Sequence, residues 1–307
     1  MLIRCLKALS EQSLEKEFFE VIVVSDGPDP ETGTALQSLG KKSKLNLKGL
    51  HTTEKRGPAA ARNLGWLSAR SPLIAFTDDD CIPNRNWLRS LLNCYQGQEL
   101  LALSGSTKVP LPKDPTDFAL NTARLQEAEF ITANCACTKT ALVKTGGFDE
   151  RFKLAWREDS DLHFKLLQLD VKILKVSKAV VIHPVRPARW GVSLKEQRKS
   201  AYEALLFRKY PDLYRSKIMQ RPLWDYYLIN LLWVILLFSI MTGHDSITRL
   251  SVAALAILLI SFTMKRLRKT SRSVKHILEM LSTSLLIPTL SVYWRLYGAV
   301  KYKVLFI

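Results

Sequence analysis

The feature that most constrains the fold is the uneven distribution of apolar residues along the chain. From Trp224 onward the sequence contains two long apolar runs, at residues 226–243 and 250–264, whereas the first two hundred residues alternate short apolar segments with charged ones. A bilayer core takes about 20 apolar residues, so the second run is short for a complete span. The sequence predicts an α/β part followed by an α-helical membrane part, with spanning helices at about 224–243 and 250–264.

A third apolar segment, at about residues 277–298, contains Glu279 and Pro288. It either crosses the membrane or lies in the interface with Tyr293, Trp294 and Tyr297 at headgroup level. A soluble, buried helical hairpin is the alternative interpretation of the two longer runs.

The formal charge of +17 is concentrated around the apolar runs. Residues 186–221 hold ten Lys and Arg against three acids, the connector 243–249 holds one of each, and residues 265–275 hold six basic residues and no acid. Lys and Arg accumulate on the cytoplasmic side of spanning helices. This order predicts a multi-pass protein of the cell (inner or plasma) membrane with its amino-terminal part in the cytoplasm. Membrane lipids account for the charge, so nucleic acid is not an expected partner.

The five cysteines include no Cys-x-x-Cys pair. Cys135 and Cys137 have no second Cys/His pair nearby, so a zinc site is not expected. We interpret the thiols as packing groups of a reduced, cytosol-facing part.

Strands and helices alternate in the first two hundred residues. The pattern predicts strands at 18–25, 45–52 and 73–77 and helices at 3–9, 31–39 and 59–68. Such alternation is typical of a doubly wound α/β sheet, whose ligands bind at the carboxyl ends of the strands. We expect a catalytic domain at residues 1–190, a basic juxtamembrane segment at 191–222 and a membrane domain at 223–307.

Three consecutive carboxylates, Asp78, Asp79 and Asp80, directly follow the strand at 73–77. Their mutual repulsion favours a bound cation, and oxygen ligands at this density suit Mg²⁺ or Mn²⁺ carrying phosphate oxygens. An acidic surface turn before the helix of Trp87 is the alternative. Asp26 ends an earlier strand and is either a site residue or a turn-former before Gly27.

A second acidic group lies at the amino end of a predicted helix whose apolar face includes Leu162 and Leu166. Glu158 and Asp159 fall where the helix dipole favours an ionised carboxylate, which suits a general base; helix capping is the alternative. His183 ends the predicted strand 179–182 and is either structural or a metal ligand.

Six segments, taken in order, resemble the inverting family 2 nucleotide-sugar glycosyltransferases of the GT-A fold, a doubly wound mixed sheet. The resemblance covers about residues 3–183. The segments are FEVIVVSDG at 19–27, RGPAAARNLGW at 56–66, FTDDDC at 76–81, GGFDE at 146–150, REDSDLHFKL at 157–166 and VVIHP at 180–184.

The resemblance implies roles for the site residues. Residues that match Asp26 and Arg62 hold the nucleotide in that family, and those that match Asp78 and Asp79 reach the nucleoside. The chain is thereby expected to bind a nucleotide-diphosphate sugar.

The resemblance also implies the metal and the catalytic base. Asp80 binds Mn²⁺ or Mg²⁺ on the diphosphate, and His183 completes the metal shell. Asp159, with Glu158 beside it, is the catalytic base. Its carboxylate takes the proton of the acceptor hydroxyl in a single inverting displacement.

The chain departs from the family pattern in two places. Family members begin with an apolar strand and a turn before the first helix, whereas Met1 lies inside the matching helix, so the amino-terminal strand is expected to be missing. Processive relatives carry Gln-x-x-Arg-Trp before the membrane. The nearest string here begins with Arg186, which predicts addition of a single sugar.

We therefore expect a membrane-anchored enzyme that moves one sugar to a lipid-linked or cell-envelope glycan acceptor. A truncated, catalytically impaired GT-A-like membrane scaffold is the alternative from another class. A nucleotidyl- or phosphosugar-handling protein is disfavoured, because no Gly-x-x-x-x-Gly-Lys loop is present.

Overall fold

The computed structural model describes the backbone of residues 1–43 and 45–306 and the side chains of residues 1–36 and 45–306. It consists of two compact units. The first unit holds Met1–Pro110 and Ala123–Val185, and the second holds Leu111–Thr122 and Arg186–Ile307. Residues 111–122, which the sequence interpretation kept with the amino-terminal domain, thus cluster with the second unit.

The first unit is built on a mixed five-stranded sheet with the strand order β3-β6-β5-β7-β4. β6 is antiparallel to both β3 and β5, β5 is parallel to β7, and the two-residue β4 is antiparallel to the end of β7. The mixed GT-A sheet expected from the sequence is confirmed. Its strands are β3 (Leu73–Phe76), β4 (Ile82–Pro83), β5 (Leu101–Lys108), β6 (Cys135–Thr138) and β7 (Lys172–Ile182).

Two further strands form a separate parallel pair, β1 (Val21–Ser25) and β2 (Leu47–His51). The sequence of β1 is Val-Ile-Val-Val-Ser, and its β-branched side chains suit a strand that is covered on both faces. Both strands lie within the ranges that the sequence predicted.

The helices of the first unit begin where the sequence pattern placed them. α3 shows why: Gly57 precedes it with φ of +99°, and Pro58 then occupies the first turn, where no backbone donor is needed. The helices are α1 (Leu2–Ser10), α2 (Pro30–Ser43), α3 (Pro58–Ser68), α4 (Trp87–Leu92), α6 (Lys139–Thr145) and α7 (Glu158–Gln168), with short 3₁₀ turns at Lys16–Phe18, Arg124–Glu127 and Thr132–Asn134.

The centre of this core is the middle of the five-stranded sheet. Leu101, Ala102 and Leu103 of β5 are completely buried between β6 and β7. The buried Trp87 of α4 donates its indole N–H to Asn134 Oδ1 at 2.8 Å, and Asn134 in turn donates to the backbone of Ser106 and Ala179. The polar atoms buried here are thereby satisfied.

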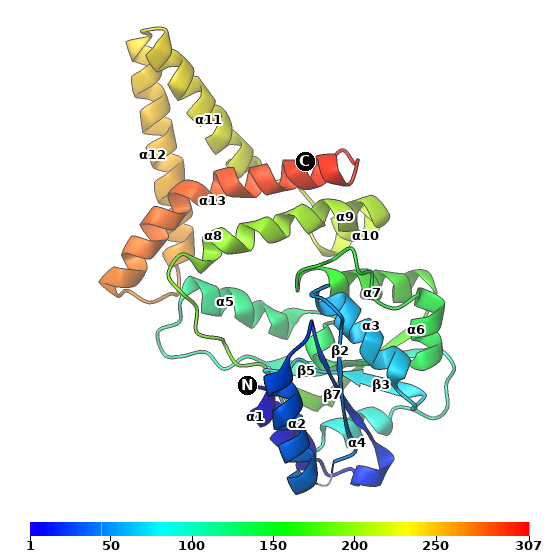
Figure 1. Ribbon diagram of the computed structural model, residues 1–307. Helices are drawn as coiled ribbons and strands as arrows, with labels where there is room; N and C mark the ends of the chain where they lie inside the picture. The colour runs from blue at the N-terminus through cyan, green and yellow to red at the C-terminus, as the bar shows by residue number, and fades with distance from the viewer. Residues whose placement is uncertain (44, 307) are drawn as a thin grey trace. The chain divides into compact units, whose positions relative to one another are not determined.

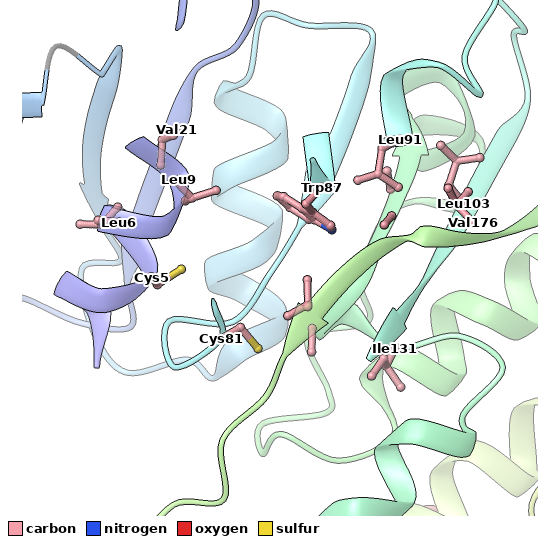
Figure 2. Packing of buried hydrophobic residues seen from close by; sticks show 14 of the residues in the cluster. Cys5, Leu6, Leu9, Val21, Cys81, Trp87, Leu91, Leu103, Ile131 and Val176 are labelled. Carbon is pink, nitrogen blue, oxygen red and sulfur yellow. The ribbon is translucent and has the colours of Figure 1, made fainter. Parts of the chain in front are cut away.

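One edge of β1 and one edge of β3 have no strand beside them in the part of the chain that the structure describes. A cavity of about 320 Å³ is lined by β1, β3, α1 and α4. Figure 2 shows Cys5, Leu6, Leu9 and Val21 on one side of this region and Trp87 on the other. Within the described residues, β1 thus pairs only with β2.

The second unit is helical. It contains most of α5 (Asp117–Ala123), followed by α8 (Val192–Glu196), a 3₁₀ turn at Gln197–Ser200, α9 (Ala201–Lys209), α10 (Pro211–Lys217), α11 (Trp224–Met241), α12 (Asp245–Leu267) and α13 (Val274–Lys301). The last three are long and apolar enough to cross a membrane. α11 and α12 form a hairpin, and α9 lies along the carboxyl-terminal part of α13 (Figure 1).

The lengths of these helices correct the sequence prediction for the second apolar run. Residues 250–264 were expected to form a helix that is short for a span, but α12 has 23 residues because its polar ends continue the helix. This length suits a bilayer core. α13 runs unbroken through Pro288, so the third segment is one helix of 28 residues.

The unpaired strand edges should be visible in hydrogen exchange. Val21 N–H donates to Asn46 O, so the N–H groups of the alternate residues Ile22 and Val24 point away from β2, toward the open edge. We expect both amides to exchange much faster than those of Leu101 and Leu103 in the central β5, measured by NMR or mass spectrometry. Equal protection in the two places would show that the edge of β1 is paired.

Candidate active site

The short β4 brings the two candidate metal-binding segments together. β3 ends at Phe76, Asp78–Asp80 form the turn that follows, and β4 then pairs with β7, placing Ile82 opposite Ile182. This pairing sets His183, the residue after β7, beside Asp80, with 3.8 Å between His183 Nε2 and Asp80 Oδ1. Ligand atoms from Asp78, Asp80, Cys81 and His183 all lie within 4.8 Å of one another.

The chemistry of this cluster fits a hard divalent ion. Two carboxylates and an imidazole are the ligands that Mg²⁺ and Mn²⁺ accept. Burial, followed by the charges of Asp78 and Asp80, raises the pKa of the Cys81 thiol well above its usual range. A hard ion prefers oxygen and imidazole ligands to a thiol, so Asp80 and His183, with Asp78 beside them, are the residues that would hold the ion.

Arg62 connects the metal-binding turn to the second acidic group. From α3 its guanidinium donates to Asp78 Oδ1 at 2.9 Å and to Glu158 Oε1 at 3.0 Å. Burial lowers the pKa of Arg62, but the two carboxylates outweigh this effect and raise it overall. One fixed cation thus joins the end of β3 to the start of α7.

Glu158 and Asp159 occupy the first turn of α7, as predicted. Burial is the main cause that raises the pKa of both carboxyl groups, and the charge of Asp159 raises that of Glu158 further, against the effect of Arg62. The Ser160 N–H donates to Asp159 Oδ1 at 2.7 Å and partly offsets the shift in Asp159. A carboxylate with a raised pKa is a stronger base than an ordinary aspartate.

The backbone that presents these carboxylates is strained. Arg157, directly before α7, has φ of +73°, a conformation that is uncommon for a residue with a side chain. Its guanidinium lies 4.7 Å from the centre of the Trp156 ring. Strain of this kind is found where a loop must aim a side chain.

The structure places Asp26 and Asp79 apart from these contacts. Asp26 follows β1, and its carboxylate accepts the backbone N–H groups of Arg56 and Gly57 at 2.8–3.0 Å. It therefore holds the loop that precedes α3, which is close to the turn-forming alternative. Asp79 is exposed at the tip of the acidic turn. The nucleotide-binding roles of both residues stay predictions.

Sequence reasoning missed how the Gly-Gly-Phe-Asp-Glu segment supports the site. Asn63 of α3 donates to Phe148 O and to Glu150 Oε1, and Glu150 also pairs with Arg56. The order of the segments had indicated a common family, but their spacing along the chain carries no signal of these side-chain contacts.

The comparisons with known proteins agree with this geometry. The family model that matches is glycosyl transferase family 2, over residues 1–150. This confirms the recognition made from the six segments.

Two curated relatives are glycosyltransferases. The chain is 29% identical to glycosyltransferase AglE of Haloferax volcanii over 113 residues, which are 37% of each chain. It is 30% identical to the pre-mycofactocin glycosyltransferase of Mycobacterium tuberculosis over 153 residues, which cover 45% of this chain and 32% of the relative. The matches thus span about a third of the length of these relatives.

A solved structure has a similar fold along almost the whole chain. It is the mannosyltransferase PcManGT from Pyrobaculum calidifontis in complex with GDP-Man and Mn²⁺, with a TM-score of 0.55 and 17% identity. The match covers 98% of this chain and 83% of that one. At this identity the likeness concerns the fold, and it supports the GT-A assignment.

The metal cluster gives a prediction that needs no substrate. Asp80→Asn removes a buried carboxylate charge from the cluster, so the variant should bind Mn²⁺ at least about tenfold more weakly, measured by electron paramagnetic resonance of free Mn²⁺. Glu99→Gln removes an exposed carboxylate that pairs with Lys144 elsewhere in the same unit, and it serves as the control. Equal Mn²⁺ affinity in Asp80→Asn and the control would exclude Asp80 as a ligand.

Proposed function

We propose that the first unit transfers one sugar from a nucleotide-diphosphate sugar to an acceptor hydroxyl. The observation that carries this proposal is the cluster of Asp78, Asp80 and His183, which Arg62 connects to Glu158 and so to the amino end of α7. The match of residues 1–150 to glycosyl transferase family 2 and the similarity to known glycosyltransferases support it.

In this mechanism Asp159 is the base. It accepts the proton of the acceptor hydroxyl while that oxygen attacks the anomeric carbon from the face opposite the leaving diphosphate, which inverts the configuration. Its raised pKa favours proton transfer, and the Ser160 N–H keeps the carboxylate oriented. Glu158 acts through Arg62, whose position it fixes together with Asp78.

The remaining site residues bind the donor. A divalent ion, Mn²⁺ or Mg²⁺, would stabilise negative charge on the leaving diphosphate. Asp80 and His183 would hold this ion, with Asp78 beside them. We assign Asp26, Arg62, Asp78 and Asp79 to the nucleotide side of the donor, as the family resemblance implies.

The acceptor is proposed to be membrane-proximal, either lipid-linked or a cell-envelope glycan. Three helices of the second unit are long and apolar enough to span a membrane, which fits a multi-pass protein of the inner or plasma membrane. Basic residues flank α11 and α12 on the side away from their connector, so the first unit is assigned to the cytoplasm.

A catalytically silent scaffold is the second candidate function, and the unpaired strand edges favour it. Asp26 follows β1 and the acidic turn follows β3, and within the described residues each of these strands has a partner at one edge only. The transfer assay below separates the two functions.

The decisive experiment is sugar transfer by membranes that contain the full chain, supplied with a panel of radiolabelled nucleotide sugars and Mn²⁺. We expect transfer by the natural sequence. Asp159→Asn should slow turnover by about 10²–10⁴-fold and leave donor binding nearly unchanged, because the amide cannot accept the proton. A collapse of donor affinity in Asp159→Asn would make Asp159 a binding residue. Absence of transfer with every donor would favour the scaffold.

The proposed orientation can be tested with fusions to alkaline phosphatase, which is active only outside the cytoplasm. A chain that ends at Gly243, after α11, should give an active fusion. A chain that ends at Ser271, after α12, should give an inactive one. The reverse pattern would place the first unit outside the cytoplasm, and activity in neither fusion would argue against the hairpin.

A further inference from the structure

Arg295 of α13 is a buried cation for which the described residues provide no counter-ion. Its side chain is 5% exposed, and within the described residues it makes no hydrogen bond or ion pair. The guanidinium lies 5.4 Å from the centre of the Phe306 ring. Burying a charge without a partner is costly, so this position favours binding of an anion.

Two acids of the second unit, Asp117 and Asp225, are paired with other cations. Asp117 lies 2.8 Å from Arg266, and Asp225 lies 3.5 Å from Lys265. Arg266 also donates to Thr283 and Ser284, so it has the partners that Arg295 lacks. Arg266 is thus fully satisfied, whereas the described residues leave Arg295 without such partners.

Arg295 and Tyr227 both have hydrogen-bond donors that the described residues leave unused. The Nε of Arg295 is buried and has no hydrogen-bond partner among the described residues. The hydroxyl of Tyr227, on α11, which packs against α13, is also buried without a hydrogen-bond partner among the described residues. A guanidinium and a phenol with unused donors are a suitable pair for phosphate oxygens.

The position of the pair along the helices indicates its depth in a membrane. Tyr227 lies in the first turn of α11, and Tyr226 beside it interacts with Arg266 near the end of α12, so the pair lies at the ends of two candidate spans.

The aromatic side chains of α13 indicate the same depth. Tyr293, Trp294 and Tyr297 form a chain of edge-to-face contacts, with ring centres 5.2 and 5.5 Å apart. Tyr and Trp concentrate at the level of lipid headgroups. Arg295 shares this stretch of helix and points to its buried side.

We propose that Arg295, together with the Tyr227 hydroxyl, binds the phosphate group of a membrane lipid. This proposal depends on the membrane association of the second unit. It does not depend on which nucleotide sugar the first unit binds. The lipid phosphate neutralises the cation that the described residues leave uncompensated.

The test uses the full chain, purified in neutral detergent and transferred to nanodiscs. One set of discs contains only phosphatidylcholine, and the other also contains phosphatidic acid, whose terminal phosphate is the probe. The readouts are the melting temperature and the number of phosphatidic acid molecules retained in native mass spectrometry. The natural sequence should be stabilised by phosphatidic acid and retain at least one molecule.

Arg295→Gln should weaken phosphatidic acid binding by about tenfold or more, and Arg295→Lys should restore part of it. Tyr227→Phe should weaken it to a smaller extent. Arg249→Gln, at an exposed position on α12, removes the same charge and should behave like the natural sequence. Equal losses in Arg295→Gln and Arg249→Gln would reduce the effect to general electrostatics and overturn the site.

Two further measurements distinguish a lipid-binding role of Arg295 from a structural role and from binding of a soluble phosphate. In neutral detergent Arg295→Gln should melt at the same temperature as the natural sequence or higher, because it removes an unpaired buried charge. A lower melting temperature would make Arg295 a structural residue. Inorganic phosphate should not reproduce the stabilisation by phosphatidic acid. If it does, the site binds a soluble phosphate, and the lipid assignment is wrong.

Discussion

The site of the first unit depends on the double ion pair of Arg62. This side chain is largely buried and touches Asp78 at the end of β3 and Glu158 at the start of α7, two segments that are eighty residues apart in the sequence. Removing one partner of a buried pair typically costs ~3–5 kcal/mol, because the remaining charges stay in a poorly solvated place. Without Arg62, two carboxylates beside further acids would repel one another, and the relative positions of the metal-binding turn and Asp159 would be lost.

The local elements of this fold could be predicted from the sequence, but the contacts that assemble the site could not. The β-branched run at Val21–Ser25 and the apolar face with Leu162 and Leu166 have clear periodic signals, and both elements form as expected. β4 has two residues and no such signal. Its pairing with β7 nonetheless sets His183 beside Asp80. The resemblance to a family supplied that proximity, since physical reasoning on the sequence left His183 open.

For the membrane helices, the sequence predicted the positions better than the lengths. Hydropathy found α11 correctly but shortened α12, because Asp245, Arg249 and Lys265 interrupt the apolar run without interrupting the helix. Polar residues at a helix end satisfy their charges in water or at headgroups while the backbone hydrogen bonds continue. Composition therefore locates the centre of a spanning helix better than it locates the ends.

Both units concentrate charge in poorly solvated places, with opposite sign. In the first unit, carboxylates crowd around the end of β3, and a divalent ion would relieve their repulsion. In the second unit, the surplus is the guanidinium of Arg295, which a phosphate would compensate. Hydrophobic residues in either place would give a more stable fold. The attraction within a buried ion pair rarely exceeds the free energy lost when its two charges leave water. These buried charges destabilise the chain on its own, so ligands of opposite charge explain them better than the stability of the fold does. Both places are therefore proposed as binding sites.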